Sequence, residues 1–384
     1  MSELKMKAMI GEVFSELATA LETGKLGSSP NVAVTVLGSE HGPAEIIRGA
    51  LLAQSQNPHL TVCLIGPLND SGLLTFEAND EAEQHAQMEQ LLDSKQIDAC
   101  VTMHYNFPIG VSTVGRVITP GRGKEMILAT TTGTSATDRV EAMIRNAISG
   151  VATAKAIGIA KPTVGVLNVD GSRQVERALN KLMEQGYPMQ WSESVRADGG
   201  AVMRGNDLLL GAPDVMVTDT LTGNLLMKVF SSFNSGGDYE ASGYGYGPGV
   251  GENYQRTILI LSRASGAPVV ASALKYAGEL VEGSLQPTAA AEYNAAFKAG
   301  MQAIFDDIKA SSQNAAPAVV APPKKVVTAE IVGIDVMQLE EASQKLWAVG
   351  IYAESGMGCV GPVVLVAPED EERATEELRK AGYF

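Results

Sequence analysis

The residues with the clearest capacity for chemistry lie near the carboxyl end of the chain, where glycines surround one cysteine. Cys359 follows Gly356 and Gly358 and precedes Gly361, immediately before an apolar run over 363–366. Glycines let backbone N–H groups approach a ligand closely, and such groups stabilise a thiolate or an oxyanion. We expect the three glycines to form a loop that presents Cys359 as a nucleophile able to carry an acyl group. A small buried cysteine in a tight turn is the structural alternative, and the residues alone leave both open.

A second candidate site is a polar turn between a strand and a helix. Asp219 ends the strand expected over 214–218, and Gly223 and Asn224 open the helix expected over 223–233. The N-terminus of a helix attracts anions, and glycine permits their close approach. The turn therefore predicts a binding site for phosphate or an oxyanion, with Asp219 orienting the network. Plain N-capping of the helix is the alternative.

A third candidate follows the strand expected over 257–261. Ser262, Arg263 and Ser265 stand between this strand and the helix expected over 268–281. Two hydroxyls and a guanidinium at a helix start suit phosphate, because arginine binds it in a bidentate manner. The chain has a net charge of −15. In so acidic a protein, an arginine at the end of a strand favours a binding site for an anion. A surface arginine beside two capping serines is the alternative.

The remaining polar and cysteine-containing segments carry weaker signals. The threonine-rich turn 130–135 could bind an anion, but capping of the next helix is favoured. The glycine-rich stretch 243–251 is expected to be a flexible loop that could cover a pocket, and it lacks the dinucleotide-binding pattern. Cys63 and Cys100 lie in apolar strands and are expected in the core. The sequence contains no Walker A segment and no metal-ligand spacing of His and Cys, so no metal site is expected.

Strands and helices alternate along most of the chain. This order predicts an α/β fold, layered α/β/α with largely parallel sheets. The expected strands cover 31–37, 61–65, 99–103, 125–130, 163–168, 214–218 and 257–261. The expected helices cover 2–24, 44–54, 81–94, 136–157, 172–185, 223–233, 268–281 and 288–308.

The chain is expected to divide into two α/β domains, a linker and an arm. The first domain comprises residues 1–150 plus 284–309, and the second comprises 151–283. Residues 310–325 are rich in alanine and proline, which is typical of a semi-extended linker. Residues 326–384 form a small α+β arm that carries Cys359, in the order strand, helix, strand, glycine-rich loop, strand, helix.

Composition and charge exclude several classes of protein. An acidic chain with 5% aromatic residues repels nucleic acids and anionic membranes, so neither is an expected partner. No apolar run approaches the roughly 20 residues of a membrane span, and the first residues lack a secretion signal. A cytoplasmic protein is therefore expected. Its 3 cysteines do not form a disulfide framework.

Part of the chain resembles two related families of acyltransferases. Residues 32–67 and the turn 219–224 resemble PlsX-type phosphate acyltransferases. The pair Ser262–Arg263 resembles the Ser-Arg turn of phosphotransacetylases, which share the fold. The resemblance covers about residues 30–285 and implies acyl transfer between a thioester and phosphate. Phosphotransacetylases carry an aspartate shortly after the turn, proposed as a base, whereas 266–270 contains no acid.

The arm adds a more specific resemblance, which spans essentially the whole chain. Residues 354–359 resemble the α subunits of component C of glycine/sarcosine/betaine reductase, enzymes of anaerobic amino-acid fermentation. This resemblance implies that an acetyl thioester on Cys359 is released by inorganic phosphate as acetyl phosphate, with no permanently bound cofactor. It implies as partners a ketoacyl synthase-like β subunit of component C and a small selenoprotein, component A, that donates a carboxymethyl group. An oligomer is expected.

Two other functions remain as alternatives. One is an acyl-carrier-protein:phosphate acyltransferase of lipid synthesis, in which Cys359 would be dispensable. The other is a non-catalytic scaffold subunit that binds an acyl phosphate or a partner. The glycine-flanked cysteine argues against both.

Overall fold

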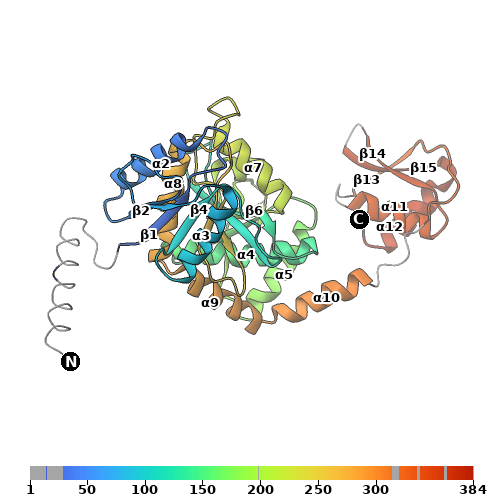
Figure 1. Ribbon diagram of the computed structural model, residues 1–384. Coiled ribbons are helices and arrows are strands. Elements are labelled where there is room, and N and C mark those ends of the chain that lie inside the picture. Colours follow the sequence, from blue (N-terminus) through green and yellow to red (C-terminus); the bar gives the residue numbers. More distant parts are fainter. Residues whose placement is uncertain are drawn as a thin grey trace. The chain divides into compact units, whose positions relative to one another are not determined.

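The computed structural model describes most of the chain as two compact units, residues 1–308 and 309–384 (Figure 1). The described residues are Phe14, 29–197, 199–313, 320–334, 338–358 and 361–383. Apart from Phe14, the helix expected over 2–24 lies outside them. The finer domain and linker boundaries given above stay predictions.

A mostly parallel sheet forms the centre of the first unit. In the described part of this unit, 12 strands pair. Their order is β3 (Thr75–Glu77), β2 (Thr61–Gly66), β1 (Asn31–Thr35), β4 (Ala99–Thr102), β12 (Ile258–Ile260), β11 (Gly247–Val250), β5 (Val111–Ile118), β6 (Glu125–Thr134), β10 (Val215–Val217), β7 (Thr163–Leu167) and β8 (Gln190–Trp191), with β9 (Val202–Met203) beside β7. The antiparallel strands β11 and β5 join two parallel halves, β3 to β12 and β6 to β8.

Helices cover both faces of the first parallel half. They are α2 (Pro43–Gln56), α3 (Glu81–Asp93) and α8 (Ala267–Glu282). Val32 and Val34 of β1 pack in one cluster with α2 and α8. The intervening Ala33 packs in another cluster with α3. Burial on both faces explains why the three central positions of the strand, 32–34, are all apolar.

The second half is layered in the same way. Its helices are α4 (Arg139–Ala156), α5 (Ser172–Glu184), α6 (Gly205–Leu210), α7 (Thr220–Ser232), α9 (Leu285–Lys298) and α10 (Met301–Gln313). Ile127 of β6 packs in the cluster that contains α4 and α9, whereas Leu128 packs with α6 and α7. The predicted α/β fold, layered α/β/α with a largely parallel sheet, is therefore confirmed (Figure 1).

Two expected elements of the first unit were wrong. The single helix expected over 288–308 is two helices, because Gly300 adopts a φ of 85° directly after α9 and ends it. The flexible loop expected over 243–251 contains β11, which is buried at the centre of the sheet. A Cβ at Gly247 would lie 1.8 Å from the carbonyl oxygen of Val114, so glycine is what lets β11 approach β5.

The second unit is a small α+β body with its own core. It contains β13 (Ala329–Val332), α11 (Leu339–Ala348), β14 (Ala353–Gly358), β15 (Gly361–Val366), a short 3₁₀ helix (Pro368–Asp370) and α12 (Glu371–Lys380). The strands form an antiparallel sheet in the order β13-β15-β14, and Ile331 and Val364 are buried with residues of α11 and α12.

The glycine-rich loop expected in the arm is instead part of a β-hairpin, so the loop interpretation of its described residues was wrong. Gly356 and Gly358 belong to β14, and Gly361 belongs to β15. Gly356 pairs with Val363, and a Cβ at Gly356 would approach Leu365 to 3.1 Å. Because Gly356 has no side chain, Leu365 of β15 has room beside β14, which is a regular strand at this position. Cys359 itself lies outside the described residues, between Gly358 and Gly361, which pair with each other.

Candidate functional site: an anion pocket between the two halves

A pocket of about 280 Å³ lies where segments of both parallel halves meet. It is lined by Glu40, Thr132, Asn224, Lys228, Tyr246, Ile260, Leu261, Ser262 and Arg263. The turns after β1 and β12 contribute from the first half, and β6 and α7 contribute from the second. The structure therefore brings together three residues that the sequence singles out as phosphate-binding candidates: Asn224, Ser262 and Arg263.

Asp219 acts as the N-cap of α7. Its Oδ1 accepts hydrogen bonds from the backbone N–H groups of Leu221 and Thr222, both at 3.1 Å. Its Oδ2 accepts from the Thr222 hydroxyl at 2.7 Å. Because Asp219 is the cap, α7 begins at Thr220 and not at Gly223 as expected. Asp219 fixes the start of the helix and is absent from the pocket lining.

Gly223 allows α7 to lie against β6. A Cβ at this position would stand 1.7 Å from the carbonyl oxygen of Thr130. The Gly223 amide already donates to the Asp219 carbonyl at 2.9 Å, so the structure gives this glycine a packing role. Its contact with phosphate stays a prediction. Because α7 and β6 lie so close, the side-chain amide of Asn224 donates a hydrogen bond to the backbone carbonyl of Thr131 at 3.0 Å. Asn224 also lines the pocket.

The turn after β12 is held by its own serines and by a distant glutamate. The Ser262 hydroxyl accepts from the Ala264 amide at 3.2 Å. The Ser265 hydroxyl accepts from the Ser262 amide at 3.2 Å and donates to Glu240 at 2.9 Å. Ser265 is fully buried and does not line the pocket, so it supports the turn. Residues 266–270, which follow the turn in sequence, contain no acid. The carboxylate that contacts this turn comes from Glu240.

Two cations from different elements border the pocket. The Arg263 side chain is 53% exposed, and its Nη2 lies 3.6 Å from Glu81. The Lys228 side chain is 56% exposed, and its Nζ lies 3.9 Å from Glu240. The Arg263–Glu81 pair is exposed on both sides, and such a pair contributes less than about 1 kcal/mol, so Arg263 can reorient towards a bound anion. Lys228 instead lies beside a buried carboxylate, because the Glu240 side chain is only 3% exposed. The pocket therefore suits a small anion despite the acidic surface.

The sequence analysis missed two important residues of this site, Lys228 and Tyr246. Lys228 lies one helical turn after Asn224, and this i, i+4 spacing could have predicted that the two share a face. Tyr246 lies in the segment that was expected to be a flexible loop. Its side chain is 4% exposed, and its hydroxyl has no hydrogen-bond partner among the described residues. Burial, and then nearby Glu240, raises the pKa of the Tyr246 phenol, which therefore stays protonated.

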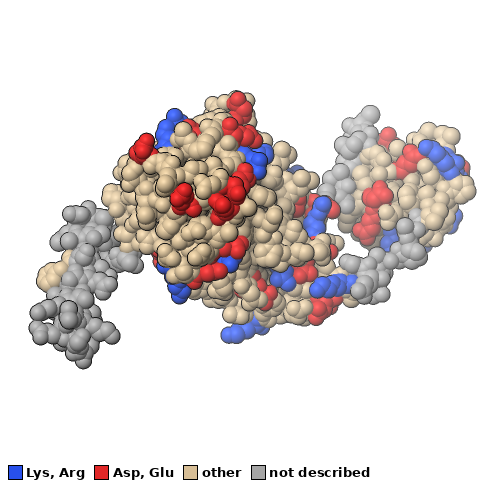
Figure 2. Space-filling view, in the orientation of Figure 1, with Lys and Arg blue, Asp and Glu red and all other residues tan. Residues whose placement is uncertain are grey.

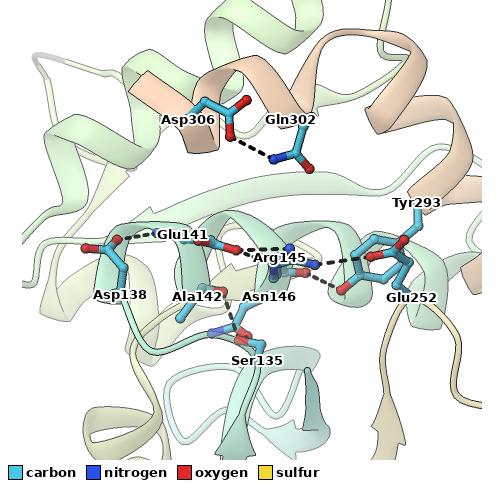
Figure 3. Close-up of polar contacts among 10 residues, drawn as sticks. All are labelled: Ser135, Asp138, Glu141, Ala142, Arg145, Asn146, Glu252, Tyr293, Gln302 and Asp306. Atoms are coloured by element: carbon cyan, nitrogen blue, oxygen red, sulfur yellow. Dashed lines mark hydrogen bonds and ion pairs between the residues drawn. The ribbon is translucent and has the colours of Figure 1, made fainter. Parts of the chain in front are cut away.

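Polar contacts surround α4, and some of them connect it to the segments next to β6 and α7 (Figure 3). The side-chain oxygen Oδ1 of Asn146 accepts hydrogen bonds from the Ser135 hydroxyl at 2.7 Å and from the Ser112 hydroxyl at 3.0 Å. Its amide donates to the Thr218 carbonyl at 3.2 Å. Asn146 thereby ties β5, the turn after β6 and the turn before α7 together. The threonine-rich turn does not cap α4, because Asp138 is the N-cap.

Arg145 secures the same helix from its other side. Figure 3 shows it between two carboxylates, Glu141 at 2.9 Å and Glu252 at 3.5 Å. Its carbonyl oxygen accepts from the Tyr293 hydroxyl at 3.2 Å, which connects α4 to α9. These contacts are structural, and they make α4 a fixed support for the pocket.

The two described cysteines belong to the core, as the sequence predicts. Cys63 and Cys100 are 2% and 0% exposed. Burial raises the pKa of Cys63 to about 12 and raises that of Cys100 as well. Both stay as unreactive thiols at neutral pH, because the thiolate is the nucleophilic form.

On the face shown in Figure 2, lysine and arginine side chains are scattered among acidic ones. Within the described residues, no three His, Cys, Asp or Glu side chains are grouped to hold a metal ion. Over the same residues, every helix is too short or too polar to cross a membrane.

The structure is an α/β protein with a small pocket that two cations border, and sequence comparisons define its family. The family model described as "Fatty acid synthesis protein" matches residues 31–365. The chain is also 56% identical over 379 residues to the glycine/sarcosine/betaine reductase complex component C subunit alpha of Peptoclostridium acidaminophilum, covering 98% of each chain. The chain therefore belongs to the fatty acid synthesis protein family and, within it, to the family of component C α subunits.

More distant relatives include phosphate acyltransferases. That of Thermotoga neapolitana is 26% identical over 232 residues, which are 51% of this chain and 68% of the relative. That of Lysinibacillus sphaericus is 27% identical over 234 residues, 51% of this chain and 69% of the relative. Among solved structures, a branched-chain phosphotransacylase from Enterococcus faecalis aligns with a TM-score of 0.46 and 16% identity, covering 66% of this chain and 99% of its own.

Proposed function

We propose that this chain transfers an acetyl group from a thioester on Cys359 to inorganic phosphate and releases acetyl phosphate. The observation that carries the proposal is the pocket, in which Arg263, Ser262 and Asn224 meet Lys228. Two cations, a hydroxyl and an amide suit the three oxygens of a phosphate group. Kinship with phosphate acyltransferases supports the same chemistry.

The reaction needs little more than positioning. A phosphate oxygen attacks the thioester carbonyl carbon, and the carbonyl electron pair moves onto oxygen. As this oxyanion collapses, the carbon–sulfur bond breaks, and the phosphate proton ends on the departing thiolate of Cys359. The thioester is already activated and phosphate is already an anion, so alignment and charge stabilisation supply the rate. Asp219 contributes by fixing the start of α7, and Glu240 by holding the turn that carries Arg263.

The size of the pocket favours a short acyl group. Pockets that enclose drug-sized ligands usually measure about 300–1,000 Å³, and this one measures about 280 Å³. Phosphate and an acetyl group fit within such a volume, whereas a long fatty acyl chain together with phosphate would extend out of it. The pocket volume therefore supports acetyl transfer over the lipid-synthesis alternative.

The relative's name supports a place for this chain in a reductase complex acting on glycine, sarcosine or betaine. In the proposed sequence, component A, a small selenoprotein, donates the carboxymethyl group. In the proposed step a second thiol attacks the selenium, the carbon–selenium bond breaks and a selenium–sulfur bond forms. The carboxyl group loses water as its carbon bonds to the Cys359 sulfur, which leaves an acetyl thioester. The β subunit of component C is the obligate partner. Phosphate then discharges Cys359 and readies it for another cycle, without a permanently bound cofactor.

Substituting Arg263 tests the phosphate site. In Arg263→Ala, we expect phosphate-dependent release of acetyl phosphate to fall about 100-fold, because a charge-assisted contact to the reacting anion is lost. Cys359 should still become acetylated by the upstream components. Both quantities are measured in the assembled complex, by acetyl phosphate formation and by peptide mass.

Arg139→Ala is the matched control, since Arg139 is also half-exposed and loosely paired, at 3.2 Å from Asp170, but lies outside the pocket. It should keep normal release. Full activity in Arg263→Ala would contradict the assignment of the phosphate site.

A further inference from the structure

The pocket contains one acid among its hydrogen-bond donors. The donors include the side chains of Asn224, Lys228, Ser262 and Arg263. Glu40 supplies the one carboxylate among the described residues that line the pocket. A carboxylate repels an anion unless the anion has a proton to share in a hydrogen bond. Glu40 therefore bears on which anions the pocket accepts.

The backbone around Glu40 is tied to the turn that carries Arg263. The Glu40 amide donates to the Arg263 carbonyl at 2.8 Å. The ring nitrogen Nε2 of the next residue, His41, lies at hydrogen-bonding distance from the Ala264 carbonyl oxygen, 3.2 Å away. These contacts fix the loop after β1 against the turn after β12, so a carboxylate and a guanidinium are held at the same pocket.

The Glu40 carboxylate is not engaged by the protein, unlike the cations of the pocket. Arg263 is paired with Glu81, and Lys228 lies beside Glu240. Glu40 is exposed, and among the described residues no cation or hydrogen-bond donor is paired with its carboxylate. An anion drawn in by the two cations therefore meets an acceptor whose lone pairs are available to it.

We propose that Glu40 selects for anions that carry a proton, by accepting a hydrogen bond from the P–OH group of hydrogen phosphate. At neutral pH inorganic phosphate keeps at least one proton, whereas sulfate keeps none. A site that hydrogen-bonds a substrate hydroxyl rejects an analogue without it, and repulsion between unprotonated oxygens adds to the rejection. This inference rests on the proposed function and assigns a specificity-determining residue to its phosphate site.

The same contact distinguishes the substrate from the product. As acetyl phosphate forms, the phosphate proton goes to the Cys359 thiolate, so the phosphoryl oxygens of the product hold no proton at neutral pH. The Glu40 carboxylate then faces an unprotonated oxygen. Repulsion between the two favours release of acetyl phosphate.

Three anions of similar shape test the proposal. Phosphate, arsenate and sulfate are titrated calorimetrically into the full chain at neutral pH and constant ionic strength. Arsenate is larger than phosphate but also keeps a proton, so it separates recognition of the proton from recognition of size. In the wild type, phosphate and arsenate should bind at least about 10-fold more tightly than sulfate, the effect of one hydrogen bond to a charged group.

Glu40→Gln keeps the size of the side chain and removes its charge. The new amide can donate to an unprotonated oxygen, so sulfate and acetyl phosphate should each bind about 5-fold more tightly than they bind the wild type. The preference for phosphate over sulfate should fall below about 3-fold. A misfolded pocket would weaken the binding of every anion, so a gain of affinity for sulfate excludes that explanation.

Glu184→Gln is the matched control. Glu184 is also exposed, at the end of α5, and lies outside the pocket. Its substitution changes the net charge of the chain by the same amount. The preference for phosphate over sulfate should stay at the wild-type value, because the selecting carboxylate is intact.

Four results would overturn the inference. They are equal wild-type affinities for phosphate and sulfate, arsenate bound as weakly as sulfate, an unchanged preference in Glu40→Gln, and a wild-type chain that binds none of the three anions. A failure of the proposed function has a different outcome. In that case the preference for phosphate would depend on Glu40, yet the Cys359 thioester would yield no acetyl phosphate.

Discussion

Cys359→Ser is expected to abolish acyl transfer, lowering the rate about 1,000-fold or more. A serine hydroxyl stays protonated at neutral pH and forms an oxyester that is less activated than a thioester. The measurement is phosphate-dependent formation of acetyl phosphate by the assembled complex. Thermal unfolding of the purified variant should stay within about 2 °C of the wild type, since the substitution is nearly isosteric.

The chain supplies its own controls for this substitution. Cys63 and Cys100 are buried, and burial raises the pKa of both thiols, so neither carries the acyl group. Cys63→Ala and Cys100→Ala should therefore lower stability but retain transfer in the folded fraction. Transfer that survives in Cys359→Ser would favour the lipid-synthesis alternative or another thiol and would contradict the proposed role.

Gly223→Ala is expected to lower both the stability and the transfer rate strongly, although it adds only one methyl group. The new Cβ would lie 1.7 Å from the Thr130 carbonyl oxygen, so α7 must move away from β6. We expect the free energy of unfolding to fall by about 3 kcal/mol, measured by denaturant titration. Asn224 and Lys228 move with α7, and misplacement by about 1 Å should lower transfer about 100-fold.

Gly205→Ala is the control for Gly223→Ala. Gly205 begins α6, and a Cβ there would meet no atom within 4 Å. Alanine also favours helix, so stability should stay equal or rise slightly. Wild-type stability and transfer in Gly223→Ala would show that the close contact of α7 with β6 is not required. That result would contradict the proposed geometry of the pocket.

The sequence predicts the parallel halves well because their strands are buried on both faces. The central positions of β1, 32–34, and of β2, 62–65, are all apolar, and turns rich in polar residues or glycine bound the two strands. Such runs alternate with amphipathic helices, which is the pattern of a layered α/β fold. The turn after β12 lines the pocket, and the turn before α7 starts the helix that lines it. Both were visible for the same reason: each joins a strand to a helix.

The antiparallel centre was not predictable in this way. β5 carries Ser112, Thr113 and Arg116, which look like surface residues, but all three are buried. Two of their partners are distant in sequence, Asn146 for Ser112 and Glu279 for Arg116. A third, Glu125, lies on the next strand and also contacts Arg116. β11 was missed because its glycines suggested a loop, whereas they permit close packing of strands.

The candidate site was predicted in part, and the differences have one physical origin. Polar residues at a helix start can bind a ligand or satisfy the backbone, and sequence alone does not separate these roles. Asp219 and Ser265 satisfy neighbouring protein groups, whereas Asn224, Ser262 and Arg263 line the pocket. Tyr246 lines the pocket through tertiary packing that the sequence does not show, whereas the i, i+4 spacing of Lys228 to Asn224 could have predicted Lys228. Cys359 remains a prediction from the sequence and its resemblance.

The central claim is that a thioester on Cys359 exchanges its acetyl group with phosphate in this pocket. Acetyl phosphate should drive the reaction backwards, so the chain is incubated with it together with its partner subunit. Peptide mass then maps any acetyl group labile to neutral hydroxylamine. We predict a thioester on Cys359 in the wild type that is lost in Cys359→Ser and strongly reduced in Arg263→Ala. An unlabelled Cys359 in the wild type, or undiminished labelling in Arg263→Ala, would contradict the account.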